Sequence, residues 1–279
     1  MSLRWKLRLV LTAVVVVPTL WAFYIEPSSL RVREYRLNLP RWPEQNRGLR
    51  VALLADLHVG SPMNGLDNLR RVVSETNSVH PDLILLAGDF VIHGVLGGHF
   101  VPPESMAAVL RDLKAPLGVY AVLGNHDWWF DGKRVASEFS KAGICMLEQQ
   151  AKEVTDIRYR FWIVGVGDLW EGAHDVKAAL DQVRDDDPVL LFTHNPDLFT
   201  EVPERVALTM AGHTHGGQVY LPLVGRLIVP SKYGDRFAIG HLVEDGRHLF
   251  VTPGIGTSML PVRFLVPPEI SVLVLDGSR

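Results

Sequence analysis

The sequence predicts an α/β fold preceded by an apolar N-terminal helix. From Leu49 onward, short apolar runs of strand length alternate with segments of helical spacing, a pattern typical of crossover units and mostly parallel sheets. Beyond Gly216 the pattern changes to short strands interrupted by Gly and Pro, which indicates an antiparallel edge or a second sheet. Ahead of the alternation, residues 1–25 contain a long uncharged stretch.

Composition excludes several classes of protein. The 279 residues include 28 Lys and Arg against 31 Asp and Glu, for a net charge of −3. This balance argues against nucleic-acid binding through a strongly basic surface, so no stable nucleic-acid partner is expected. Hydrophobic residues make up 47% of the chain, which excludes intrinsic disorder. The single cysteine, Cys145, excludes a disulfide framework and a cysteine-based zinc cluster. A transition-metal site must therefore use histidines and carboxylates.

The N-terminal stretch predicts a membrane anchor over residues 1–25. Residues 9–25 carry no charge, follow a basic segment, and end in an aromatic group formed by Trp21, Phe23 and Tyr24. Aromatic side chains at one end of an apolar helix are typical of the interface between lipid and water. A cleaved signal sequence is the alternative. An uncleaved helix would contact membrane lipid.

The flanking charges leave the orientation of this helix undetermined. Three basic residues and the amino terminus precede the apolar stretch, and four arginines follow it closely, so the positive-inside rule gives nearly a tie. Residues 26–48, rich in Arg and Pro, are expected to form an extended linker. Residues 49–279 are expected to form one globular domain.

Each element of the domain is predicted from a local pattern. Apolar runs too short for helices predict buried strands; these cover residues 50–55, 83–87, 119–123, 161–166, 189–193 and 206–211. Apolar residues that recur on one side, such as Leu66, Leu69 and Val72, predict helices. Pro103 begins one helix and Gly143 ends another as a left-handed cap. The predicted helices cover residues 66–79, 104–114, 133–142 and 175–184.

Polar side chains follow five of these strands, at the edge where α/β sheets bind ligands. They are Asp56, His58, Asp89, Asn125, His126, His194, His213 and His215. Because residues i and i+2 at a strand end point the same way, Asp56 and His58 can reach one ion. The set exceeds the needs of one ion, and two ions that share Asp89 would satisfy it. Oxygen and imidazole ligands suit Mn, Fe, Zn, Co or Ni, which the sequence does not distinguish.

These five motifs, in this order, resemble the calcineurin-like metallophosphoesterase superfamily. The resemblance implies a two-sheet sandwich flanked by helices, in four α/β/β/α layers, with a dinuclear metal centre at the sheet edge. It implies further that two divalent ions activate a hydroxide for attack on phosphorus. The implied ligands are Asp56, His58 and His215 for one ion, Asn125, His194 and His213 for the other, and Asp89 for both. By the same resemblance, His126 protonates the leaving-group oxygen.

A narrower resemblance is to the bacterial YaeI-like and YkuE-like phosphodiesterases. It lies in residues 164–170, 194–197, 212–218, 254–258 and 267–269. It implies a single-pass protein of the bacterial inner or cell membrane that cleaves a phosphodiester or pyrophosphate bond. Lipid-linked substrates of the UDP-2,3-diacylglucosamine type are candidates. The alternatives are a nuclease or nucleotide phosphodiesterase of the same superfamily, or a metal-binding scaffold without turnover.

The sequence also departs from the superfamily pattern after Asp89. Phosphoprotein phosphatases of the superfamily carry Asp and Arg where this chain has Ile92 and His93, which argues against a phosphoprotein substrate. The change removes the usual carboxylate partner of the catalytic histidine, and Asp127 is a candidate replacement. Further candidates for positions near the metals or the substrate are Trp128, Asp168 and Arg263.

Overall fold

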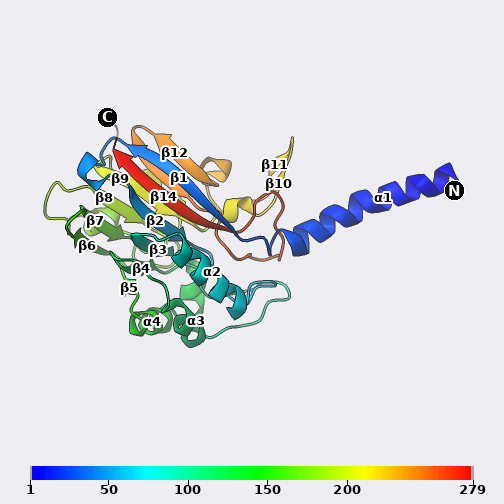
Figure 1. Ribbon diagram of the computed structural model, residues 1–279, viewed down its shortest axis with the longest axis horizontal. Helices are drawn as coiled ribbons and strands as arrows, with labels where there is room; N and C mark the ends of the chain where they lie inside the picture. Colours follow the sequence, from blue (N-terminus) through cyan, green and yellow to red (C-terminus); the bar gives the residue numbers. More distant parts are fainter. Residues whose placement is uncertain (1, 278–279) are drawn as a thin grey trace.

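Two six-stranded sheets form the centre of the computed structural model, which describes residues 2–277 (Figure 1). The first sheet consists of β1 (Arg31–Leu39), β2 (Leu49–Leu54), β3 (Leu83–Ala87), β4 (Val119–Val122), β5 (Cys145–Met146) and β14 (Glu269–Gly277). The second consists of β6 (Gln150–Thr155), β7 (Arg160–Gly165), β8 (Val189–Phe192), β9 (Val206–Ala211), β12 (Gly240–Glu244) and β13 (Arg247–Val251). A short hairpin, β10 (Tyr220–Leu221) and β11 (Gly225–Arg226), lies outside both sheets.

Both sheets have parallel centres, as the alternation of strands and helices predicts. The first has the order β1-β14-β2-β3-β4-β5, and only the pair β14 and β2 is antiparallel. The second has the order β12-β13-β9-β8-β7-β6, with antiparallel pairs at its two edges. The change of pattern beyond Gly216 therefore corresponds to the hairpin and to an antiparallel edge.

The strands are apolar throughout because both of their faces are buried. Leu53 of β2 and Leu85 of β3 belong to the core between the sheets, together with Phe161 and Phe192 from the second sheet. Their neighbours along the chain, such as Leu54, point to the opposite face and belong to a second core. Successive side chains of a strand point to opposite faces, so the continuous apolar runs fill two layers.

Helices cover the outer face of each sheet and complete four layers. Against the first sheet pack α2 (Leu66–Ser78), α3 (Pro103–Leu110) and α4 (Asn125–Lys141). Against the second pack α5 (Val176–Leu180) and the 3₁₀ helix Pro196–Glu201. The predicted two-sheet sandwich flanked by helices is confirmed.

Helix α4 begins eight residues earlier than the sequence pattern predicts, at Asn125 instead of 133. Gly124 is its N-cap, and the Asp127 carboxylate accepts the Gly124 N–H as part of a capping box. Asp131 has non-helical backbone angles inside the helix, which explains why only the second half has a clear apolar period. Gly143, with φ of +88°, confirms the predicted left-handed end.

The N-terminal helix projects away from the sheets (Figure 1). It comprises α1 (Leu3–Leu20) and a π-helical continuation, Trp21–Ile25. The 22 residues Arg4–Ile25 are long and apolar enough to cross a membrane, a property that signal sequences share.

The predicted linker over residues 26–48 is wrong in its central part. Residues 31–39 form β1, which pairs in parallel with β14 along its whole length, from Arg31 opposite Glu269 to Leu39 opposite Gly277. Edge strands tolerate charged side chains on an exposed face, so β1 lacks the apolar pattern of the other strands. Leu37 and Leu39 are nevertheless buried in the core between the sheets.

Candidate metal centre

All seven predicted metal ligands lie together at one edge of the sandwich. Strands β2, β3 and β4 of the first sheet and β8 and β9 of the second end at this edge, and each is followed directly by candidate side chains. All seven side chains are buried: Asp56, His58, Asp89, Asn125, His194, His213 and His215. The site therefore lies where the carboxyl ends of the two sheets meet.

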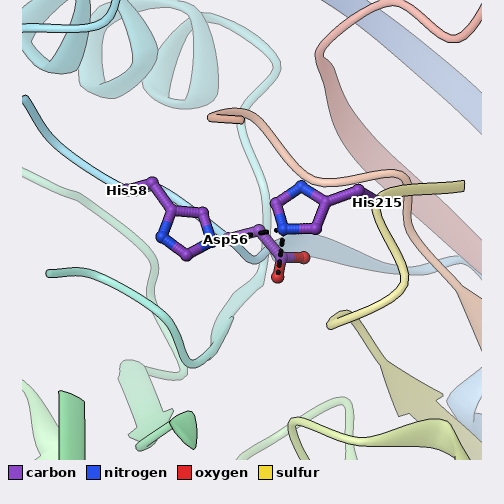
Figure 2. Close-up of side chains that lie close together, drawn as sticks. All are labelled: Asp56, His58 and His215. Atoms are coloured by element: carbon purple, nitrogen blue, oxygen red, sulfur yellow. Dashed lines mark hydrogen bonds and ion pairs between the residues drawn. The ribbon is translucent and has the colours of Figure 1, made fainter. Parts of the chain in front are cut away.

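The first cluster consists of Asp56, His58 and His215, whose ligand atoms lie within 4.8 Å of one another. Figure 2 shows the two imidazole rings facing each other above the Asp56 carboxylate. The Nε2 atoms of His58 and His215 are 3.2 Å apart, and His215 Nε2 is 3.5 Å from Asp56 Oδ1. Two nitrogens and one carboxylate thus converge on a space that one cation can fill.

The second cluster consists of Asp89, His194 and His213. His194 Nε2 lies 3.2 Å from Asp89 Oδ2 and 3.1 Å from His213 Nδ1. The same Asp89 oxygen is 3.5 Å from His58 Nε2 in the first cluster. Asp89 therefore lies between the two clusters, where a bridging carboxylate belongs.

Backbone carbonyls set the ring orientation of two of the histidines. Nδ1–H of His194 donates to the Ala87 carbonyl at 2.7 Å, and Nδ1–H of His58 donates to the Val91 carbonyl at 3.3 Å. Each contact turns Nε2 toward the other candidate ligands. Carbonyl partners of this kind orient metal-binding imidazoles and raise their basicity.

Burial keeps several of the imidazoles neutral, the form that binds cations. It lowers the pKa of His58 and of His213 to about 3. Burial also acts on Asp89, but the charges of His194 and His126 outweigh it and hold the pKa of Asp89 well below its ordinary value. Burial lowers the pKa of His194, but the Asp89 carboxylate outweighs it and raises that pKa well above its ordinary value. Asp89 is therefore an ionised acceptor between a protonated His194 and the neutral rings of His58 and His213.

The donor set fits two divalent cations better than a network of protein hydrogen bonds. The Oδ1 atom of Asn125 is buried and has no hydrogen-bond partner among residues 2–277. Buried amide oxygens without a partner are rare in proteins. Carboxylates Asp56 and Asp89, the Asn125 oxygen and the imidazole nitrogens together match the ligand preferences of first-row transition metals.

The backbone at these ligands is strained. Five of them have left-handed φ angles: Asp56 (52°), His58 (37°), Asp89 (57°), His213 (69°) and His215 (52°). Residues other than Gly rarely adopt this conformation, which costs about 1–3 kcal/mol at each position. Such strain is typical of functional sites, and the surrounding fold must compensate for it.

Glycines allow the ligand loops to approach one another closely. A Cβ on Gly88 would lie 2.5 Å from the backbone nitrogen of Gly124, and one on Gly212 would lie 2.7 Å from Asp56 Oδ2. Gly254 has the same role in the segment before β14, because its Cβ would lie 2.6 Å from that of Asp56. No side chain other than hydrogen fits at these positions.

His126 lies beside the clusters and is more exposed than the ligands. Its Nε2 is 4.0 Å from Asp89 Oδ2, and its backbone N–H donates to Asp89 Oδ1 at 2.9 Å. Its Nδ1 has no hydrogen-bond partner among the described residues. The ring therefore lies against Asp89 and next to the ring of His58, 4.7 Å away.

The prediction that Asp127 orients His126 is wrong. Both Asp127 oxygens accept backbone N–H groups, from Asp89, Phe90 and Val91 at 2.9 Å and from Gly124 at 3.0 Å. The carboxylate thus fastens the loop after β3 to the start of α4. It positions the backbone of Asp89.

Two half-exposed tryptophans, Trp129 and Trp170, form an aromatic wall near the site. The candidate Trp128 instead packs against the core between the first sheet and its helices. The Trp129 ring lies 4.8 Å from the His126 ring, and the Trp170 ring lies 4.6 Å from the His213 ring. The two indoles are 6.4 Å apart and about half exposed. They form an apolar surface on the side of the second cluster.

Asp168 supports this wall. Its Oδ2 accepts the backbone N–H groups of Trp170 and Glu171, at 2.8 and 3.1 Å. Glu171 in turn accepts the indole N–H of Trp129 at 2.7 Å. Asp168 therefore acts on the loop that carries Trp170.

Arg263 does not bind substrate phosphate, contrary to its place among the candidates. Its guanidinium is fully buried and donates to the carbonyls of Pro253, Val266 and Gly256. It fastens the segment before β14, which packs against Asp56. A sequence cannot distinguish such a buried arginine from an exposed one.

Glu148 is a residue near the site that no sequence motif indicates. Its carboxylate is buried and accepts the backbone N–H of Leu123, at the end of β4. The other carboxylate oxygen of Glu148 lies close to Gly167, because a Cβ added to that glycine would be 3.0 Å from it. Burial raises the pKa of Glu148 to about 7.

Comparisons with known proteins agree with this geometry. The sequence model of the family described as calcineurin-like phosphoesterase matches residues 49–217, a stretch that contains all seven candidate ligands and His126. The chain is 30% identical to the uncharacterized metallophosphoesterase YkuE of Bacillus subtilis, over 93% of this chain and 90% of the relative. It is 30% identical to the phosphodiesterase YaeI of Escherichia coli, over 90% of each. It is 26% identical to the UDP-2,3-diacylglucosamine pyrophosphatase LpxG of Chlamydia trachomatis, over 94% of this chain and 95% of the relative.

Proposed function

The chain belongs to the calcineurin-like phosphoesterase family and is a metal-dependent phosphoric ester hydrolase, and from this premise we propose that it cleaves a phosphodiester or pyrophosphate bond in a lipid-linked substrate. The observation that carries the proposal is the pair of clusters that share Asp89, with His126 beside them. Substrates of the UDP-2,3-diacylglucosamine type are the leading candidates.

Two divalent cations are the cofactor of this family. Asp56, His58 and His215 would hold one cation, Asn125, His194 and His213 would hold the other, and Asp89 would contact both. When bound, the two ions supply an acidified water and neutralise the charge that develops at phosphorus. The buried, oriented imidazoles and the strained loops position these ligands before any ion arrives.

His126 would hold the proton for the leaving-group oxygen. Burial lowers the pKa of His126, while the Asp89 carboxylate raises it. Burial outweighs the carboxylate, so the pKa of His126 lies below that of a free imidazole. General acids of this kind contribute about 10²–10⁴-fold to the rate.

Three observations favour a diester or pyrophosphate with an apolar part. The relatives named phosphodiesterase and UDP-2,3-diacylglucosamine pyrophosphatase align over nearly their whole lengths. Ile92 and His93 replace the Asp and Arg expected for a phosphoprotein substrate. Trp129 and Trp170 offer a stacking surface for a base or an acyl chain beside the second cluster.

The N-terminal helix supports a location in the bacterial inner or cell membrane. Its apolar stretch, Arg4–Ile25, is mostly exposed in the structure and has no core to cover. One of the relatives is itself named a transmembrane protein with a metallophosphoesterase domain. A single-pass anchor would keep the hydrolase beside its lipid substrate.

A substrate panel with the metal-reconstituted full chain tests the proposal. The chain is stripped of metal, reloaded with Mn, Zn, Co or Ni, and assayed on UDP-diacylglucosamine, glycerophosphodiesters, wall-polymer phosphodiesters, nucleotides and single-stranded DNA. We expect the highest kcat/KM on a lipid-linked diester or pyrophosphate, and the Asp89→Asn variant is the inactive control. Preferred cleavage of DNA would instead support a nuclease, and no hydrolysis with any metal would support a binding scaffold.

A further inference from the structure

Large apolar side chains are exposed at the end of the domain from which α1 leaves. They come from the β10–β11 hairpin and its continuation, from the segment before β14, and from the loop after β3. We call this set the apolar rim: Leu96, Leu223, Val224, Leu227, Ile228, Met259, Leu260 and Leu265, all at least 49% exposed. Contiguous apolar patches of this kind mark interaction surfaces in proteins.

Hydrogen bonds join the three segments into one surface. The Leu96 N–H donates to the Met259 carbonyl at 2.9 Å, which links the loop after β3 to the segment before β14. The Tyr220 N–H donates to the Phe264 carbonyl at 2.9 Å, which links the hairpin to the same segment. The three segments that carry the rim are therefore joined to one another, although they lie far apart in the sequence.

The rim is also attached to the N-terminal helix. The Arg263 N–H donates to the Ala22 carbonyl at 2.9 Å, and Ala22 is buried there. Trp21, Arg31 and Leu265 line one cavity of about 160 Å³ at this junction. Figure 1 shows the β10–β11 hairpin at the same end of the domain as the base of α1.

This contact fixes the depth of the rim relative to the helix. Ala22 lies three residues before Ile25, roughly one helical turn inside the domain-side end of the apolar stretch. Trp21, Phe23 and Tyr24 at this level are the side chains expected at a membrane interface. If α1 spans a bilayer, the segment that contacts Ala22 lies at the interfacial layer.

The same segments reach the metal centre. The β10–β11 hairpin follows His215 after only four residues. In the segment before β14, a Cβ on Gly256 would lie 2.7 Å from the Cβ of His58. Two sides of the first cluster are therefore built from the chain segments that carry the rim.

We propose that the apolar rim docks on the lipid bilayer that holds α1, so that the metal centre receives phosphate groups of lipids that remain in the membrane. The proposal rests on the proposed function for its substrate and on the anchor for its membrane. The continuity of the rim with α1 identifies the bilayer as the occupant. Arg31, exposed at the start of β1, would lie beside anionic headgroups.

Depth-dependent fluorescence tests the docking without using activity. The full chain carrying Cys145→Ser and Leu223→Cys is labelled with a polarity-sensitive dye and reconstituted in vesicles of phosphatidylethanolamine and phosphatidylglycerol. The control carries Ile157→Cys, a fully exposed position between β6 and β7, at the far edge of the second sheet. We expect a blue shift and quenching by brominated lipids at Leu223→Cys only. Equal, water-like emission at both positions would overturn the proposal.

Charge substitution tests the consequence for the substrate. We expect Leu223→Glu with Ile228→Glu to lower turnover of a vesicle-embedded phosphodiester at least tenfold, with turnover of soluble bis-p-nitrophenyl phosphate unchanged. The matched control is Ile157→Glu, which should affect neither. Equal loss of turnover on both substrates would overturn the proposal. A wild-type chain that is dimeric in detergent, with a double variant that is monomeric, would also overturn it, because the rim would then be a dimer interface. If the wild type hydrolyses neither substrate, the proposed function fails while the fluorescence result still decides the docking.

Discussion

Asp127 accepts four backbone N–H groups, and we call this arrangement the clamp. Substitution of Asp127 by Asn tests whether Asp127 acts as this clamp or orients the His126 ring. Asn keeps one acceptor oxygen and replaces the other by an NH₂ group, so two of the four backbone N–H groups lose their partner. Hydrogen bonds to a charged group contribute about 1.5–3 kcal/mol each, so the free energy of unfolding should fall by about 3–6 kcal/mol. Because the clamp holds Asp89, metal affinity should fall as well.

Urea unfolding of the metal-loaded chain and calorimetric metal titration measure the two effects. Asp67→Asn is the matched control, because Asp67 is fully exposed and makes only a surface ion pair with Arg70, worth at most about 1 kcal/mol. A clamp predicts lower stability and weaker metal binding together. If Asp127→Asn were as stable as the wild type, kept both metals, and lost only kcat with a shifted pH profile, the clamp would be refuted.

Three further substitutions test other parts of the structure. His126→Ala should keep both metals by elemental analysis and lose about 10²–10⁴-fold in kcat on a substrate with a poor leaving group; unchanged kcat would exclude the general acid. Gly254→Ala should weaken metal binding because its Cβ would meet Asp56, whereas Gly246→Ala, equally left-handed but in open space, should lose only stability; equal metal affinity in both variants would contradict the contact. Leu39→Ala should lower the free energy of unfolding by about 2–5 kcal/mol, since Leu39 is fully buried. An unchanged urea unfolding curve would instead support a linker over residues 31–39.

The candidate ligands could be predicted from the sequence because each follows a recognisable strand. Parallel strands buried on both faces are continuous apolar runs, and their carboxyl ends meet at one edge. His194 and His213 could therefore be assigned to the same edge although they come from different strands. The φ angles of the ligands could not be predicted, because the strain at Asp56 or His215 depends on contacts with distant segments such as Gly254.

The predictions that failed concern positions where partners are distant in the sequence. A carboxylate next to a histidine suggests an orienting pair, but the partners of Asp127 are backbone groups, three of them about 37 residues away. Arg263 resembles a phosphate ligand until its three carbonyl partners and its burial are known. Strand β1 is stabilised mainly by its backbone pairing with β14 at the other end of the chain. None of these partners leaves a periodic signal.

Metal content of the reconstituted chain tests whether its centre holds two cations bridged by Asp89. Elemental analysis by mass spectrometry, after removal of loosely bound ions, gives the number of cations per chain for the wild type and for Asp89→Ala. We expect two cations per wild-type chain and at most one in Asp89→Ala, because Asp89 Oδ2 faces both clusters. Two cations retained in Asp89→Ala would show that Asp89 is not the bridge, and a single cation in the wild type would exclude a dinuclear centre.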